Sequence, residues 1–309
     1  MAPGTGIVRR RLGRPQAGGL GRRLDRHISW LFVLPAALFL GAVVAFPVVY
    51  TAGLSLFRWS GAAATPPAWI GLQNYGDVFA GDPGFRNALF VTAYFTGVSV
   101  LIEVSLGVGL AQLLNREFIG KGLARTLLIL PVAGTPVALA LVWRNMYNPS
   151  NGIFTWFAEL LRLPPQRWIA DAATVVPSLI LFDVWQWTPL VMLITLAGLV
   201  SLPSDFYEAA QIDGASPWQA FWRITLPLVR PTVVAAAMLR FMDSVKTFDQ
   251  IYVTTQGGPG IASQTLNLFV FDQAFQYLHF GYASALLVVL FFVILAGNLI
   301  LVSVRRGQA

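Results

Sequence analysis

The sequence predicts an all-α protein, a bundle of helices that crosses a membrane six times. Of its 309 residues, 56% are hydrophobic and only 11% are charged, whereas soluble domains carry about 25% charged residues. Apolar stretches of about 20 residues or more, enough to span a bilayer, recur along the chain. The expected spans lie at about 28–54, 88–114, 123–146, 174–200, 232–255 and 281–304.

The first 27 residues are expected to be a basic leader without fixed structure. They are rich in glycine and arginine, a composition that buries little apolar surface. From Ile28 to Phe57 no side chain is charged, and this stretch is too long for the apolar part of a signal peptide. We therefore interpret it as a retained first span, and residues 28–309 as one transmembrane domain.

The distribution of lysine and arginine predicts that both termini are cytoplasmic. With the N-terminus inside, fourteen of these residues lie in or beside the inner segments and five lie in or beside the outer loops. The inner segments are then 1–27, 115–122, 201–231 and 305–309. The net charge of +7 is thus explained by topology and lipid contact, and we expect no nucleic-acid partner.

The second span combines an acid with small residues. Small side chains four residues apart suit close packing of membrane helices, and they occur here at Ser105, Gly107, Gly109 and Ala111. We interpret Glu103 as a packed, hydrogen-bonded structural acid, with a role in transport as the alternative.

The fourth and fifth spans carry polar side chains on regular faces. One face of the fourth span holds Asp183, Gln186, Trp187 and Leu190, and one face of the fifth holds Arg240, Ser244 and Thr247. A carboxylate and an amide can bind sugar hydroxyls, and an indole offers an apolar platform for a pyranose ring. The alternative is that Asp183 and Trp187 only pack helices and that Arg240 and Asp243 form a structural ion pair.

The residue inventory argues against an enzyme, a cofactor or a metal site. The chain has no cysteine and only two histidines, His27 and His279, which are not clustered. Its only lysines, Lys121 and Lys246, lack the glycines of a phosphate-binding loop. ATP hydrolysis, if the protein depends on it, is therefore expected on another chain.

The segment 201–231 is a polar hairpin between apolar runs. A helix over 204–212 is expected to end at Gly214, which reaches the left-handed region at no steric cost. Ser216, Pro217 and Gln219 predict the capped start of a second helix, which Pro227 is expected to limit. Trp218, Phe221 and Trp222 form one apolar stripe. The alternative is an amphipathic helix pair lying at the membrane surface.

The hairpin resembles the EAA loop of ABC importer permeases. The resemblance rests on Glu208-Ala209-Ala210, on Gly214 after three further residues, and on Ile224-Thr-Leu226-Pro227. Two further blocks, 183–189 and 248–259, resemble carbohydrate importer permeases, the second of them the MalF-type half in particular. The chain is therefore identified as a minimal, six-span MalF-type permease.

This resemblance implies a set of partners in a prokaryotic cell membrane. A second, MalG-type permease would complete the path, two ATP-binding subunits would dock below, and an extracytoplasmic binding protein would deliver the sugar. Glu208 would pair with a basic residue of the ATPase, Gly214 would turn the loop, and Trp218 to Ile224 would fill the ATPase groove. Positions that match the polar faces of the fourth and fifth spans line the substrate site in the family.

Two alternatives differ in the solute or the energy source. An ABC importer for a non-sugar solute, such as an amino acid or a phosphate ester, would share the EAA loop. An ion-coupled carrier could use Glu103, Asp183 and Asp243 as a relay, but it would not need a capped cytoplasmic hairpin.

Overall fold

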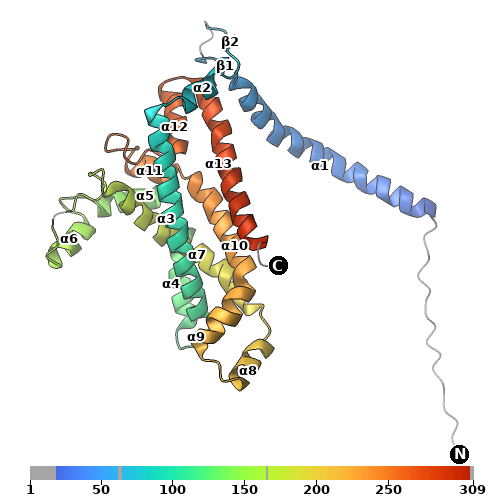
Figure 1. Ribbon diagram of the computed structural model, residues 1–309, viewed down its shortest axis with the longest axis vertical. Coiled ribbons are helices and arrows are strands. Elements are labelled where there is room, and N and C mark those ends of the chain that lie inside the picture. Colours follow the sequence, from blue (N-terminus) through green and yellow to red (C-terminus); the bar gives the residue numbers. More distant parts are fainter. Residues whose placement is uncertain (1–18, 62–64, 165, 307–309) are drawn as a thin grey trace, which may run out of the picture. The chain divides into compact units, whose positions relative to one another are not determined.

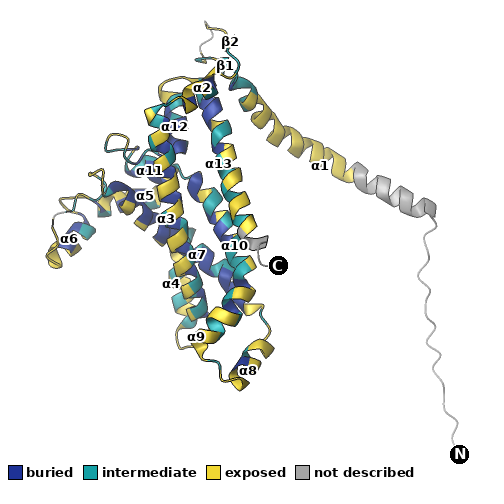
Figure 2. Cartoon of the chain, in the orientation of Figure 1, coloured by how far each residue is buried: buried dark blue, intermediate teal, exposed yellow. Residues whose placement is uncertain are grey.

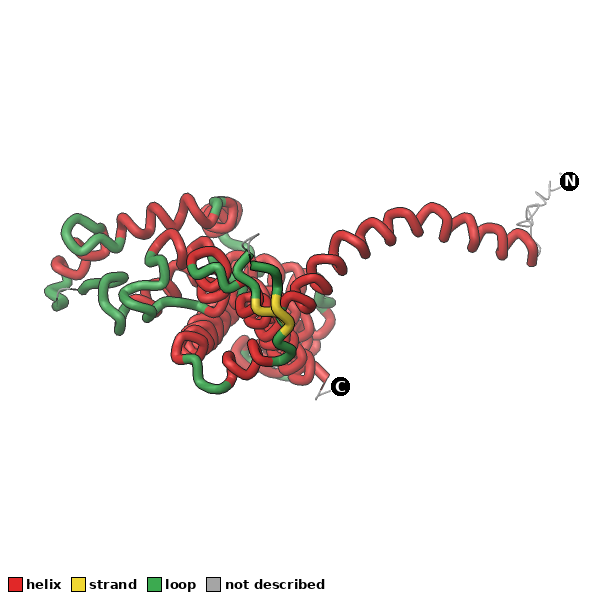
Figure 3. The backbone as a smooth tube through the Cα atoms, turned by 90° about the horizontal axis from the view of Figure 1, so that it is seen from above, coloured by secondary structure: helices red, strands yellow, loops and turns green. Residues whose placement is uncertain are grey.

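The computed structural model describes residues 19–61, 65–164 and 166–306, and most of them are helical (Figure 1). The longer helices are α1 (Gly19–Leu54), α3 (Pro83–Leu114), α4 (Lys121–Ala133), α5 (Pro136–Met146), α7 (Val175–Val200), α10 (Leu226–Val245) and α13 (Phe280–Arg306). The shorter ones are α2 (Gln73–Phe79), α6 (Ile153–Leu160), α8 (Asp205–Ile212), α9 (Pro217–Ala220), α11 (Asp249–Thr254) and α12 (Leu266–Phe271), with the π-helical turns η1 (Phe221–Thr225) and η2 (Asp272–Gln276). The strands β1 (Phe57–Arg58) and β2 (Ala68–Trp69) form one short antiparallel pair, visible in Figure 3.

The chain divides into two units, Met1–Tyr50 and Thr51–Ala309. The first unit contains most of α1, and within α1 the apolar side chains from Phe32 to Val49 are exposed. Such a helix suits lipid or another membrane protein as its surroundings. Residues 1–18 of the predicted leader lie outside the described residues, but the chain is helical from Gly19. The predicted disorder is therefore wrong for 19–27.

Among the described residues, five helical segments are long and apolar enough to cross a membrane. They are Phe32–Leu54, Pro83–Leu114, Val175–Val200, Pro217–Val245 and Phe280–Ser303. The pair α4 and α5 makes a sixth if it counts as one bent span. The prediction of an α-helical membrane bundle is confirmed.

The predicted third span, 123–146, is not one straight helix. Its two halves, α4 and α5, meet at 98°. Thr135, between them, is extended, with φ −68° and ψ 135°, because a residue before proline avoids the helical region. Pro136 then starts α5 at a position where its missing N–H costs nothing.

The predicted fifth span, 232–255, begins and ends later in the sequence than the helix in the structure. The structure has a continuous helical segment from Pro217 to Val245, and α11 follows as a separate short helix. Pro227 does not end the second hairpin helix but sits in the first turn of α10. The wider π-turn η1 directly precedes it, where a regular α-helix would press the proline ring against the carbonyl of residue 223.

The core of the second unit is the contact between α3 and α7, and α7 is the most buried span (Figure 2). Gly107 on α3 allows this approach, because a Cβ there would come within 2.7 Å of Val191 on α7. The small-residue packing predicted for the second span is confirmed at Gly107 and at Ala111, both of which are buried. The α3–α7 pair is thus the platform on which α10 is packed.

Candidate functional site

The polar hairpin has the local structure that its sequence predicts. Helix α8 runs from Asp205 to Ile212, and Gly214 follows with φ +72°. The Ala215 N–H donates to the Ala210 carbonyl at 2.9 Å, and the Gly214 N–H donates to the Gln211 carbonyl at 3.1 Å. These bonds close the helix end around a left-handed glycine.

The second hairpin helix begins with the predicted capping box. The Ser216 hydroxyl accepts from the Gln219 N–H at 3.3 Å, and the Gln219 side chain accepts from the Ser216 N–H at 2.8 Å. Pro217 occupies the first helical turn. From Pro217 the helical path continues through η1 into α10. The second helix of the hairpin and the fifth span are therefore one continuous helical segment.

Most of the predicted coupling residues lie at the surface of this unit. The exposed ones are Glu208, Ala209, Gly214, Trp218 and Pro227, the half-buried ones are Phe221, Ile224 and Leu226, and Ala210 is buried. Trp218 is 70% exposed. Other apolar side chains of the hairpin are exposed as well, among them Phe206, Ile212 and Trp222.

The aromatic stripe also borders a groove against α3. Trp218, Phe221 and Trp222 pack on one another, with ring centroids 5.2–6.2 Å apart. Together with Gln112 and Arg116 of α3 and its following loop, they line a cavity of about 710 Å³. The α3 side of the groove was not predicted, because residues about 100 positions away carry no local signal.

A buried charge cluster joins the three core helices. The Arg240 guanidinium on α10 donates from Nε to Glu103 Oε2 at 2.7 Å and from Nη2 to Glu103 Oε1 at 3.0 Å. Nη2 also donates to Asp183 Oδ2 on α7 at 3.2 Å. The three side chains are at most 1% exposed. Two-pronged arginine–carboxylate bonds are among the strongest polar contacts in proteins.

Trp187 covers this cluster. The Arg240 guanidinium carbon lies 4.8 Å from the centre of the indole ring, within the range of a cation–π contact. Asp183 and Trp187 both belong to α7, so this helix supplies two of the groups that contact the guanidinium. Trp187 itself is half-buried.

The predicted substrate-path residues therefore fall into two groups. Four of them are buried inside this chain, at no more than 1% exposure: Asp183, Gln186, Arg240 and Ser244. The other three, Trp187, Leu190 and Thr247, are half-buried. That all seven side chains line the substrate path stays a prediction.

The ion-pair partner of Arg240 was not predicted. Asp243, the alternative partner, instead lies 3.4 Å from Lys246 in an exposed pair. The interpretation of Glu103 as a buried, hydrogen-bonded acid is confirmed. Sequence reasoning placed Glu103 and Arg240 on separate spans and gave no reason to bring them together. The only available signal was that charged side chains within membrane spans tend to pair with one another.

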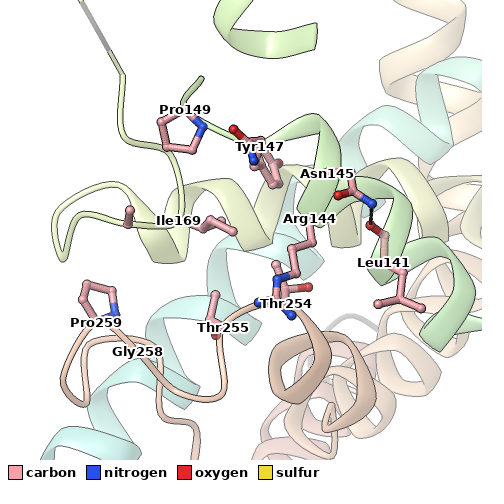
Figure 4. A pocket seen from close by; sticks show the side chains of 12 residues that line it. Leu141, Arg144, Asn145, Tyr147, Pro149, Ile169, Thr254, Thr255, Gly258 and Pro259 are labelled. Carbon is pink, nitrogen blue, oxygen red and sulfur yellow. Dashed lines mark hydrogen bonds between the residues drawn. The ribbon is translucent and has the colours of Figure 1, made fainter. Parts of the chain in front are cut away.

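A second cavity, of about 710 Å³, lies where α5 meets the loop that follows α11 (Figure 4). Arg144, Asn145, Thr255 and Pro259 border it, and Arg144 donates to the Val253 carbonyl at 3.4 Å. Nearby, the Tyr147 hydroxyl donates to the Ser178 carbonyl at 2.6 Å. Burial raises the pKa of Tyr147, so this phenol remains a neutral donor that joins the end of α5 to α7.

Comparisons with known proteins agree with this architecture. The trehalose/maltose transport system permease protein MalF of Thermococcus litoralis is 35% identical over 282 residues, which are 91% of this chain and 95% of that protein. The trehalose transport system permease protein SugA of Mycobacterium tuberculosis is 36% identical over 273 residues, 87% of this chain and 86% of that protein.

A solved structure shares the fold. A chain of a bacterial ABC transporter involved in the import of the acidic polysaccharide alginate matches with a TM-score of 0.79 at 22% identity, over 94% of this chain and 99% of that chain. Residues 103–307 match the family model described as binding-protein-dependent transport system inner membrane component. The chain therefore belongs to this family of ABC importer permeases, the membrane-embedded subunits of binding-protein-dependent transport systems.

Proposed function

We propose that this permease subunit forms half of the path of an ATP-driven sugar importer. A second permease completes the path, two ATP-binding subunits dock on the hairpin, and an extracytoplasmic binding protein delivers the sugar. Support for a sugar comes from relatives named for trehalose and maltose, at 35% and 36% identity over most of both chains. Because the family is binding-protein-dependent, an ion-coupled carrier is the weaker alternative.

We place the hairpin and both termini in the cytoplasm. The support is the charge distribution, with fourteen lysines and arginines on or beside the proposed inner side and five on or beside the outer. An ATPase that docks on α8 and α9 is then on the side where ATP is available.

The observation that carries the proposal is the unbroken path from the hairpin to the charge cluster. The segment Pro217–Val245 includes exposed Trp218 at one end and buried Arg240 near the other. A displacement of the hairpin by an ATPase therefore moves the helix that holds Arg240. No separate linker is needed between the docking surface and the membrane core.

The proposed sugar-facing surface is the half-buried side chain of Trp187, with half-buried Leu190 one turn further along α7. Arg240 fixes the indole from one side at 4.8 Å, so the ring is oriented before a solute arrives. The remaining exposed indole surface suits the apolar face of a pyranose. The buried Asp183 and Gln186 supply polar support behind it.

The second candidate solute class is a non-sugar molecule, such as an amino acid or a phosphate ester. Anionic members of that class need a cation free to bind them. At this cluster, Arg240 is already bound by two carboxylates. The geometry therefore favours the sugar.

The test of the coupling role is charge reversal on α8 in the reconstituted importer. We expect Glu208→Lys to insert normally but to lose co-purification of the ATPase and ATP-driven uptake of trehalose or maltose. Asp205→Lys is the matched control, because Asp205 is also an exposed acid in the first turn of α8. Normal uptake by the Glu208→Lys variant at normal expression would refute the role.

A further inference from the structure

We propose that Glu103 is a specificity-determining residue, which restricts this permease to uncharged sugars by neutralising Arg240. This inference rests on the proposed function and narrows its substrate class. Glu103 lies on α3, outside the two faces assigned to the sugar path. It acts on the solute through Arg240 and through its own charge.

The first step is that the Arg240 cation is fully engaged. Glu103 accepts from Nε and Nη2, Asp183 accepts from Nη2, and Trp187 covers the guanidinium plane. The arginine side chain is 1% exposed. A guanidinium is the group that best binds carboxylates and phosphates in two-pronged fashion. Here Glu103 occupies that geometry, so an anionic solute cannot use it.

The second step is the charge count of the cluster. Two carboxylates share one guanidinium, so the cluster has no surplus positive charge. The cluster is buried between α3, α7 and α10, where an unbalanced charge is more costly than in water. A carboxylate or phosphate on a solute beside Trp187 therefore finds no cation that offsets the loss of its hydration. An uncharged sugar needs none.

The third step is a buried amide next to the cluster. Gln186 is 0% exposed, and within the described part of the chain neither its Nε2 nor its Oε1 has a hydrogen-bond partner. Buried polar atoms normally have partners. An amide offers both a donor and an acceptor without charge, which matches a sugar hydroxyl. Gln186 lies one helical turn from Asp183 on α7, so this buried position next to Asp183 adds an uncharged polar group and no cation that an anionic solute could use.

The fold alone does not determine whether the solute is charged, because a transporter of an acidic solute shares it. The structurally similar transporter imports the acidic polysaccharide alginate, and its 22% identity with this chain leaves the solute charge open. Glu103 decides that question here, since its neutral isostere would leave Arg240 with a single carboxylate partner.

The experiment measures direct binding to the purified complex of this chain, its partner permease and the ATPase subunits, without the binding protein. The probes are trehalose and maltose, and the same disaccharides with one primary alcohol oxidised to a carboxylate. The readout is the ratio of the dissociation constants of the acidic and the neutral probe. If Glu103 had only a structural role, its substitution would weaken the binding of both probes equally and leave this ratio unchanged.

For the wild type we expect the acidic probes to bind at least about tenfold more weakly than the neutral ones. Glu103→Gln should lower the ratio by about tenfold, and Glu103→Asp should keep it near the wild-type value. If Glu103→Gln does not assemble, Asp183→Asn removes the same charge and leaves the two-pronged pair in place. Glu117→Gln is the matched control, because Glu117 forms an exposed pair with Lys121.

If the Glu103→Gln or Asp183→Asn variant binds the neutral probes but keeps the wild-type ratio of dissociation constants, Glu103 does not determine selectivity. The proposed sugar path would not be affected by that result. Equal binding of acidic and neutral probes to the wild type would overturn the selectivity role as well. Failure of all probes to bind the wild type would refute the proposed sugar path and this inference with it.

Discussion

The hydroxyl groups of Tyr207 on α8 and Thr225 in η1 share a hydrogen bond of 3.1 Å. Thr225 is buried, and its hydroxyl also lies 3.4 Å from the Ala220 carbonyl five residues earlier. The bond fastens the first hairpin helix to the wide turn that joins the second hairpin helix to α10. A force on α8 thus reaches the fifth span through Thr225 as well as through the backbone.

The first prediction concerns this bond. Tyr207→Phe removes the shared hydrogen bond, and Thr225→Val removes it together with the bond to the Ala220 carbonyl; each bond is worth about 0.5–1.5 kcal/mol. We expect both variants to assemble and hydrolyse ATP but to consume more ATP per sugar imported. The ratio of hydrolysis to uptake in proteoliposomes checks this. Because Tyr207 bonds to Thr225, the double variant should be no worse than Thr225→Val alone; additive losses would show that the two groups act separately.

The second prediction concerns the hairpin turn. Gly214 has φ +72°, and a Cβ there would meet no atom within 4 Å, so a substitution is limited by backbone strain alone. Gly214→Val should cost at least about 1–2 kcal/mol locally, because a β-branched residue resists positive φ. We expect it to reduce co-purification of the ATPase subunits.

Gly214→Asn is the control for that strain, since asparagine tolerates the left-handed region. It should retain most of the docking. Equal behaviour of the valine and asparagine variants would mean that the turn conformation does not matter for docking.

The third prediction concerns stability. Glu103→Ala leaves Arg240 buried without its main partner, which typically costs about 3–5 kcal/mol. We expect a large drop in the thermal inactivation temperature of the purified complex. Glu117→Ala, which breaks the exposed pair with Lys121, should change it little, since surface pairs contribute about 0–1 kcal/mol.

The triple substitution Glu103→Leu, Arg240→Met and Asp183→Leu completes that test. It replaces all three members of the buried charge cluster by apolar side chains, which is often close to neutral for stability. It should recover much of the stability lost in Glu103→Ala. A triple variant as unstable as Glu103→Ala would show that shape, rather than the unpaired charge, causes the loss.

The fourth prediction concerns sugar recognition. Trp187→Ala removes the indole that lies over Arg240 and should raise the half-saturating sugar concentration of stimulated ATP hydrolysis by about tenfold. Trp187→Phe should lose less. Trp185→Ala is the control, because Trp185 is exposed and packs against Trp143, with ring centroids 5.3 Å apart. Similar losses in both alanine variants would assign Trp187 to packing.

Local structure could be predicted from the sequence where short-range chemistry decides it. The capping box at Ser216 and Gln219 and the left-handed Gly214 follow from backbone hydrogen bonds within a few residues, and both are confirmed. The interpretation of Pro227 as a helix end used the same kind of rule and is wrong. The π-turn that accommodates it has no simple residue signature.

Long-range pairing could not be predicted in this way. Arg240 and Glu103 are 137 residues apart, and Asp243, one helical turn away, was the nearer candidate. The choice between them depends on how α10 packs against α3 and α7, which hydropathy does not encode. For the same reason, the spacing of the seven residues predicted to line the path did not show that four of them are buried or that Thr247 lies beyond the end of α10.

The docking of the ATPase on the hairpin is tested most directly by a Gln211→Cys variant labelled with a membrane-impermeant maleimide. Gln211 is an exposed residue of α8, and the chain contains no native cysteine. A Ser150→Cys variant serves as the comparison for the opposite face, because Ser150 is exposed between α5 and α6. We expect the thiol at position 211 to be labelled in inside-out vesicles stripped of the ATPase, to be protected when the ATPase subunits are added back, and not to be reached in right-side-out vesicles. Labelling of position 211 from the outside, or equal labelling with and without the ATPase, would contradict the role of the hairpin as the ATPase docking surface.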